Sequence, residues 1–168
     1  MGTEKYPDED EYEKFLSKYG GFGNAYTDME DTNYYFSVTT QQTTPDQTSE
    51  ALSGGLDRLA QFFISPTFDE SMVDRECQAI DSEYRNGKTS DSWRNFQFLK
   101  AVGNVNHPFA KFGCGNYETL TKEGSTVGEL KRFWETYYTT SNLRLAVVGG
   151  SSLDALQKTV EETFGLLS

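Results

Sequence analysis

The stretch Asp69–Asn86, DESMVDRECQAIDSEYRN, decides both the fold and the search for a site. Asp69 is a favourable N-cap residue, and Gly87 comes directly after the stretch. We therefore predict a helix that begins after Asp69, runs through Asn86 and is interrupted at Gly87. Its apolar residues recur at the spacing of one helical face: Val73, Cys77, Ile80 and Tyr84.

Two pairs of acidic residues lie at the edges of this apolar stripe. Helical residues seven positions apart differ by about 20° in direction, so they share a face. Glu76 and Glu83 form one such pair beside Ala79, and Asp74 and Asp81 form the other on the opposite edge. A half-buried carboxylate needs a cation, a donor or a metal. Periodicity alone does not choose between the pairs, and solvated boundary carboxylates are the simplest interpretation of both.

The rest of the chain alternates between helical and strand-like patterns. The order of elements predicts an α+β fold, a two-layer sandwich of helices packed on a mostly antiparallel sheet, formed by one domain over residues 1–168. Three strands are few for such a sheet, so we expect that strands are missing from one end of the domain. Before residues 69–86 we expect a helix from Pro7 to Tyr19, strands over 24–27 and 33–39, and a helix that ends before Pro66. After them we expect helices near 93–100 and 127–138, a strand over 143–148 and a last helix over 153–167.

Composition excludes several classes of function. The chain has 168 residues, 36% of them hydrophobic, and a net charge of −11, which argues against nucleic acid as a partner because phosphate binding needs a basic patch. The apolar runs are too short to span a membrane. The start lacks the pattern of a signal peptide, so we expect an intracellular protein, cytoplasmic or mitochondrial.

Few residues outside residues 69–86 offer chemistry by themselves. Cys77 and Cys114 form neither a disulfide framework nor a CxxC motif, and we interpret them as small core or boundary residues. His107 is the single histidine and precedes Pro108 in a loop. It has no Ser or Cys partner at a telling spacing, so we interpret it as a turn residue rather than a base or a ligand.

Longer phrases of the sequence resemble the first catalytic domain of the insulin-degrading, pitrilysin-like family of zinc metallopeptidases. They occur in the order found in the family and cover nearly the whole chain. No single phrase is decisive, but the combination is specific. The phrases are GTEKYPDEDEYEKFL, NAYTDMEDTNYYF, ALSGGLDRLAQFFISPTFDES, REC-QAIDSEYRN, SWRNFQFLKAVGNVNHPFAKFGCGN and the strand, turn and helix after Leu143.

The resemblance implies a zinc site and an assignment of residues to it. In the family, a helix with the motif H-x-x-E-H supplies two histidine ligands and the glutamate that activates water. By its place in the phrase DSEYRN, Glu83 resembles the third zinc ligand, and Glu76 resembles the supporting glutamate next to the site. The resemblance further implies that substrates lie along Asn24 and Ala25 and near the side chains of Trp93 and Phe96.

The sequence also departs from the family, because it contains no H-x-x-E-H motif. In the family this motif, with further strands, precedes the Gly-Thr pair that Gly2 and Thr3 match, so the resemblance implies an N-terminally truncated domain. We expect a fragment of a longer peptidase that acts on small or unfolded peptides with sister domains of the same chain. The alternative is a non-catalytic paralogue that binds peptides or subunits without a metal.

We predict that this chain alone has no zinc-dependent peptidase activity, because a zinc site needs about three protein ligands and Glu83 supplies one. The measurement is cleavage of a fluorogenic peptide with added zinc. Turnover above the metal-free blank that a chelator abolishes would contradict the prediction.

Overall fold

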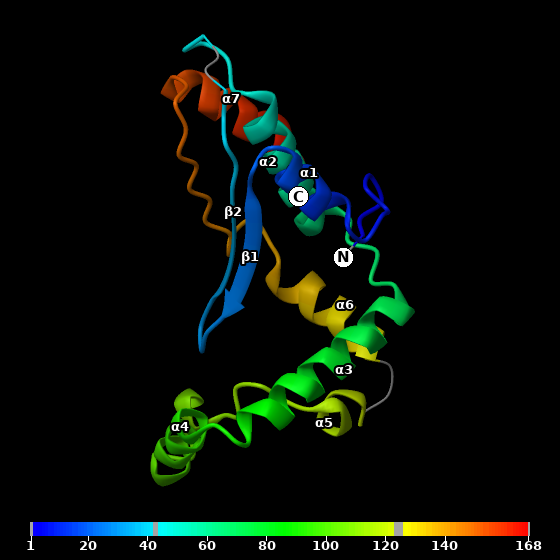
Figure 1. Cartoon of the computed structure of the whole chain (residues 1–168), viewed down its shortest axis with the longest axis vertical. Coiled ribbons are helices and arrows are strands. Elements are labelled where there is room, and N and C mark those ends of the chain that lie inside the picture. Colours follow the sequence, from blue (N-terminus) through cyan, green and yellow to red (C-terminus); the bar gives the residue numbers. More distant parts are fainter. Residues whose placement is uncertain (1, 42–43, 123–125, 168) are drawn as a thin grey trace. The chain divides into compact units, whose positions relative to one another are not determined.

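The computed structural model describes residues 2–41, 44–122 and 126–167 (Figure 1). The chain forms two compact units, each built from separate stretches of sequence. The first unit comprises Met1–Ala25, Tyr34–Phe68 and Lys131–Ser168, and the second comprises Tyr26–Asn33 and Asp69–Leu130. Among the described residues, no helix is long and apolar enough to cross a membrane.

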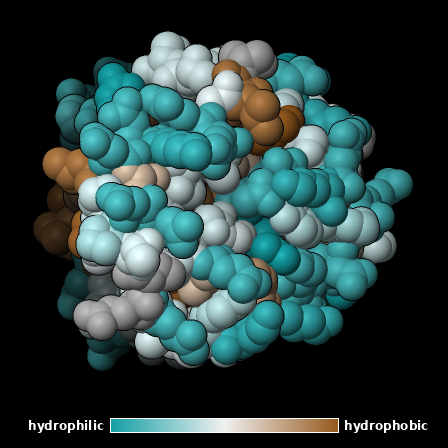
Figure 2. All heavy atoms as spheres, turned by 90° about the horizontal axis from the view of Figure 1, so that it is seen from above, coloured by the Kyte–Doolittle hydropathy of each residue, from teal (hydrophilic) through white to brown (hydrophobic). Residues whose placement is uncertain are grey.

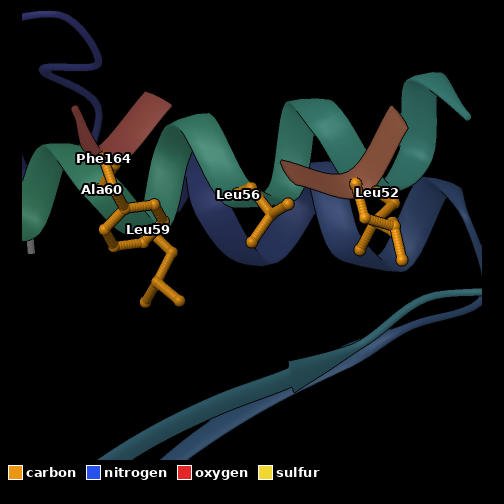
Figure 3. Close-up of a cluster of buried hydrophobic side chains, with 6 residues drawn as sticks. Leu52, Leu56, Leu59, Ala60 and Phe164 are labelled. Atoms are coloured by element: carbon orange, nitrogen blue, oxygen red, sulfur yellow. The ribbon is translucent and has the colours of Figure 1, made fainter. Parts of the chain in front are cut away.

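Helix α2 is the centre of the first unit. It runs over Glu50–Ile64, and the Ser49 side chain caps it by accepting a hydrogen bond from the Leu52 amide. Helices α1 (Glu11–Lys18) and α7 (Leu153–Phe164) both pack against it. Leucines spaced along α2 project from one side of the helix, and Phe164 of α7 lies beside Ala60 (Figure 3). The buried cluster consists of Leu52, Leu56, Leu59, Ala60, Leu156 and Phe164.

A β-hairpin packs on the same cluster through β2. Strand β1 (Phe22–Thr27) pairs with β2 (Thr32–Ser37), and the Asp28 amide bonds to the Asp31 carbonyl at 2.9 Å in the turn between them. The glycine pair in α2 makes room for both neighbours. A Cβ on Gly54 would overlap the Phe15 ring of α1, and one on Gly55 would lie 2.6 Å from the Phe36 ring of β2.

The second unit contains four helical segments besides the tip of the hairpin. They are α3 (Glu70–Gly87), α4 (Asp91–Val102), the short 3-10 helix η1 (Pro108–Ala110) and α5 (Tyr117–Thr121). Helix α3 contacts α5, and α4 contacts η1. Helix α6 (Thr126–Tyr137) begins in this unit and ends in the first.

The α+β class and the order of the elements are as the sequence predicts, with three differences. Helix α1 begins at Glu11 rather than at Pro7, because residues 8–10 form a turn. Helix α5 was not predicted. The strand expected over 143–148 is wrong: this segment pairs with no strand among the described residues, whose sheet has only β1 and β2. An apolar extended segment becomes a strand only when a neighbour receives its hydrogen bonds.

Polar side chains cover much of the face that Figure 2 shows, with apolar residues gathered in small separate areas. This distribution agrees with the net charge of −11. The packed interior of the first unit is the small buried cluster around α2.

We predict that Leu56→Ala lowers the free energy of unfolding by about 2–5 kcal/mol, because it leaves a cavity in the cluster. Leu56 is 2% exposed, whereas Leu153, at the start of α7, is 83% exposed. The matched control Leu153→Ala should change stability by less than about 0.5 kcal/mol. Urea unfolding followed by circular dichroism measures both, and equal losses would show that this cluster is not the core of the first unit.

Candidate functional site

Helix α3 is anchored at its first turn by Asp69. One carboxylate oxygen of Asp69 accepts hydrogen bonds from the Ser71 amide at 3.0 Å and the Met72 amide at 3.1 Å. The Ser71 hydroxyl also donates to this carboxylate, and these bonds lower the pKa of Asp69. The N-cap fixes where α3 begins, and therefore which residues of the helix face inward.

The inward face of α3 is the apolar stripe that the sequence predicts. Cys77 is buried, and Val73, Ile80 and Tyr84 are half-buried. Burial raises the pKa of the Cys77 thiol, and the neighbouring carboxylates of Asp74 and Glu76 raise it further. The thiol is therefore a neutral core group, as expected, and it is poorly suited to act as a nucleophile.

The Asp74 and Asp81 edge of α3 is engaged by α5. The Tyr117 hydroxyl donates to Asp74 at 2.9 Å, and the Tyr117 amide donates to Asp81 at 3.2 Å. Asp74 also accepts from the Gln78 amide group at 2.7 Å, and Asp81 forms an ion pair with Arg85 at 2.7 Å. The bond to Asp74 raises the pKa of Tyr117. Both aspartates thus serve the packing of α3 against α5.

The Glu76 and Glu83 edge differs in every one of these respects. Glu76, Ala79 and Glu83 are all exposed. Within the described part of the chain, neither glutamate side chain makes a hydrogen bond or an ion pair. The small side chain of Ala79 lies between them in sequence and leaves this edge of the helix open. Two carboxylates on one open helical edge are free to receive a cation from outside the chain.

A pocket of about 830 Å³ lies within the second unit, between the hairpin tip, the end of α3, α4 and the segment around Phe112. Trp93 and Phe96 line it, with 54% and 49% of their surface exposed. Trp93 packs closely over Gly87, where a Cβ would lie 3.2 Å from the indole ring. Both aromatic side chains are therefore exposed at the pocket rather than buried in a core.

Asn24 and Ala25 are not among the residues that line this pocket. Asn24 and Ala25 are exposed in β1, and the Asn24 side chain accepts from the Ala25 amide at 2.8 Å. They belong to the first unit, and Glu83 belongs to the second. Cys114 is half-buried and lines the pocket. His107 is a turn residue, as expected, because its Nδ1 accepts from the Phe109 amide at 3.1 Å and caps η1.

One lining residue was not recognised from the sequence. Lys100 is only 2% exposed, although it carries a charge. Its ammonium donates to the Lys111 carbonyl at 3.0 Å and lies over the rings of Phe96 and Phe109. A signal was present, since Trp93, Phe96 and Lys100 are spaced to share one face of α4. Lysine is rarely buried, so spacing alone did not indicate this environment.

Known proteins match the chain along almost its full length. Residues 1–110 match the family model described as insulinase, peptidase family M16, and residues 125–168 match the model described as the peptidase M16 inactive domain. The chain belongs to the insulinase family, peptidase family M16. The fold and family that the sequence phrases implied are therefore confirmed.

Individual members of the M16 family are similar over nearly the whole chain. Insulin-degrading enzyme of Bos taurus is 47% identical and that of Homo sapiens is also 47% identical, each over 98% of this chain and 16% of the relative. A putative zinc protease of Schizosaccharomyces pombe is 43% identical with the same coverage. The crystal structure of pitrilysin matches with a TM-score of 0.86 and 32% identity, over 99% of this chain and 17% of that chain. This M16 chain thus spans about a sixth of the length of these proteins.

We predict that Asp81→Ala lowers the free energy of unfolding by about 1 kcal/mol, because it removes the acceptor for the Tyr117 amide. Glu83→Ala, two residues away on the open edge, is the matched control and should stay within about 0.5 kcal/mol of the parent chain. Both are measured by urea unfolding without metal. A larger loss for Glu83→Ala than for Asp81→Ala would contradict the division of α3 into an engaged and an open edge.

Proposed function

We propose that this chain supplies one zinc ligand and part of the peptide-binding surface of a zinc-dependent metalloendopeptidase, with Glu83 as the ligand. The observation that carries the proposal is the difference between the two edges of α3. Asp74 and Asp81 are held by Tyr117, whereas Glu76 and Glu83 are exposed and make no hydrogen bond or ion pair within the described residues. Membership of a peptidase family supports the hydrolytic function.

Glu76 is the supporting carboxylate in this proposal. It lies seven residues before Glu83, so both glutamates point from the same edge of α3. Carboxylates that do not touch the metal orient the ligands that do, and their loss typically weakens metal binding or activity by about 10–100-fold. Glu76 is exposed, and its side chain makes no hydrogen bond or ion pair among the described residues, so it is available to orient a ligand brought to this edge.

The described residues do not by themselves form a zinc site. No group of three or more His, Cys, Asp or Glu residues among them could hold a metal ion, and His107 is engaged in capping η1. Zinc in peptidases is held by about three protein ligands and polarises the substrate carbonyl and the attacking water. Glu83 fits such a site as one ligand, and the remaining ligands must come from elsewhere in the protein. No hydrolytic step is therefore assigned to this chain's own residues.

Peptide binding is the second part of the proposal. Every residue of β1 is exposed, and among the described residues β1 pairs only with β2. An extended peptide can add to such an edge through main-chain hydrogen bonds, which would place it along Asn24 and Ala25. Within the second unit, Trp93 and Phe96 separately offer aromatic surface for peptide side chains. We infer that the substrates are small or unfolded peptides.

The relatives' names support this chemistry and imply further domains. Relatives are named insulin-degrading enzyme and putative zinc protease. The chain covers 16% of their length, so we propose that sister domains of the same longer chain complete the site and enclose the peptide. An intracellular location remains a prediction.

A non-catalytic function is the second candidate. Residues 125–168 match the model described as the peptidase M16 inactive domain, and the described residues hold no complete set of zinc ligands. The same strand edge and pocket would then bind a peptide or a subunit without cleaving it. An in-frame H-x-x-E-H motif upstream of Met1 in the gene would favour the peptidase, and a genuine start at Met1 would favour the binding protein.

We predict that Glu83→Gln removes most bound zinc from a longer chain in which the histidine motif precedes Gly2, because it replaces a charged ligand by a neutral amide. Glu76→Gln should weaken zinc binding or activity by about 10–100-fold, and the control Asp81→Asn should change it little. Zinc per chain is measured by atomic absorption after dialysis. Full occupancy in Glu83→Gln together with loss in Asp81→Asn would show that the ligand is assigned to the wrong edge of α3.

A further inference from the structure

The pocket of the second unit contains a buried positive charge that the zinc site does not use. Lys100 has the largest of the fully buried side chains in the described chain. An ammonium group has three N–H donors, and the hydrogen bond to the Lys111 carbonyl at 3.0 Å uses one of them. Its centre lies 4.9 Å from the Phe96 ring and 5.5 Å from the Phe109 ring. No described carboxylate lies within ion-pair distance of it.

Burial of the Lys100 ammonium is unfavourable unless further hydrogen-bond acceptors or an anion compensate for its lost hydration. Moving an ammonium group from water into a protein interior is unfavourable. One carbonyl and two ring faces offset only part of this cost. A methionine would fill the same space without this cost. Lys100 is one of the residues that line the pocket, so we infer that an acceptor entering the pocket can complete the hydrogen bonding of its ammonium.

The charge of the pocket lining is opposite to that of the chain. Lys88, Arg94 and Lys100 line the pocket, and Asp28 is the single acidic residue of the lining, in a chain of net charge −11. Arg94 also forms an exposed ion pair with Asp91 at 3.7 Å, so Lys88 and Lys100 are the main sources of positive charge. Asp28 is occupied at the hairpin turn, where its carboxylate accepts from the Met29 amide at 2.7 Å. The other walls are aromatic: Tyr84 and Phe112 meet edge to face at 5.7 Å. The pocket therefore combines aromatic surface with positive charge.

We propose that this pocket recognises a carboxylate on a peptide, with Lys100 as the residue that determines the specificity. The carboxylate accepts hydrogen bonds from the Lys100 ammonium, and the adjoining apolar part of the peptide packs on Trp93 and Phe96. Either the C-terminal carboxylate or a Glu or Asp side chain supplies this chemistry. Naming a peptide as the ligand rests on the proposed function, whereas the carboxylate preference rests on the pocket itself.

The test uses this chain without zinc and without turnover, so it is independent of the proposed peptidase activity. The two tryptophans, Trp93 and Trp134, give separate indole signals in a proton–nitrogen NMR spectrum, and they lie in different units. Acetyl-phenylalanine and its amide compare a chain-end carboxylate with a neutral group. Acetyl-glutamate α-amide and acetyl-glutamine α-amide make the same comparison for a side chain. The Trp93 signal should move with a carboxylate probe, while the Trp134 signal stays in place.

At least one carboxylate should bind about tenfold or more tightly than its neutral counterpart, as expected for a hydrogen bond to a charged group. The pair with the larger ratio identifies the chain end or the side chain as the source. Lys100→Met should reduce the ratio of carboxylate to neutral affinity to about one. The control Lys122→Met should leave this ratio unchanged, because it makes an equal change of charge at an exposed position outside the pocket. Equal binding within both pairs, or a ratio that survives Lys100→Met, overturns the proposal.

A second variant covers the case in which Lys100→Met loses its dispersed NMR signals. Lys88 and Arg94 are exposed at the pocket, so replacing both by methionine leaves the buried packing intact. This double variant should lower the carboxylate affinity about two- to fivefold through the lost local charge. An unchanged affinity would contradict the proposal.

Discussion

Tyr117 bonds twice to α3, with its amide to Asp81 and its hydroxyl to Asp74, at 3.2 and 2.9 Å. Because these two aspartates are seven residues apart, one tyrosine occupies a whole edge of the helix. The opposite edge, with Glu76 and Glu83, has no such partner among the described residues. Acidic residues flank the apolar stripe on both sides, so the stripe alone does not distinguish the two edges of α3. The contact with Tyr117 makes the two edges chemically different. The proposed assignment of Glu83 as a metal ligand rests on that difference and on the resemblance of the phrase DSEYRN to the family.

The first unit depends on a different constraint, the close packing on both sides of α2. Gly54 and Gly55 let the rings of Phe15 and Phe36 approach the helix from α1 and β2. The hairpin is thereby held through β2, and β1 keeps its backbone available on one edge. Packing on a core needs a filled interior, whereas the peptide addition that we propose needs an unpaired strand edge. Strand β2 packs on the core, and β1, which pairs only with β2 among the described residues, is the edge proposed for the peptide.

Much of the fold and part of the candidate site could be predicted from the sequence, and the exceptions have physical causes. Strong local signals placed α3, its N-cap at Asp69 and its apolar stripe. Helix α5 was missed because five residues are too short to show a helical period. The segment over 143–148 has a strand pattern but no partner among the described residues, since pairing is a property of the neighbour as well. Periodicity could not choose between the glutamate and aspartate pairs, because Tyr117 lies far along the chain. The burial of Lys100 contradicts the usual behaviour of lysine.

Our central proposal is that a zinc ion of the longer protein lies on the Glu83 edge of α3. Anomalous X-ray scattering at the zinc absorption edge, from crystals of the zinc-loaded longer protein, locates the ion without relying on activity or on substitutions. The account predicts one peak about 2.0–2.2 Å from a Glu83 carboxylate oxygen, the usual zinc–carboxylate distance. A peak bound to Asp74 or Asp81, or a fully occupied zinc with no ligand from α3, would contradict it.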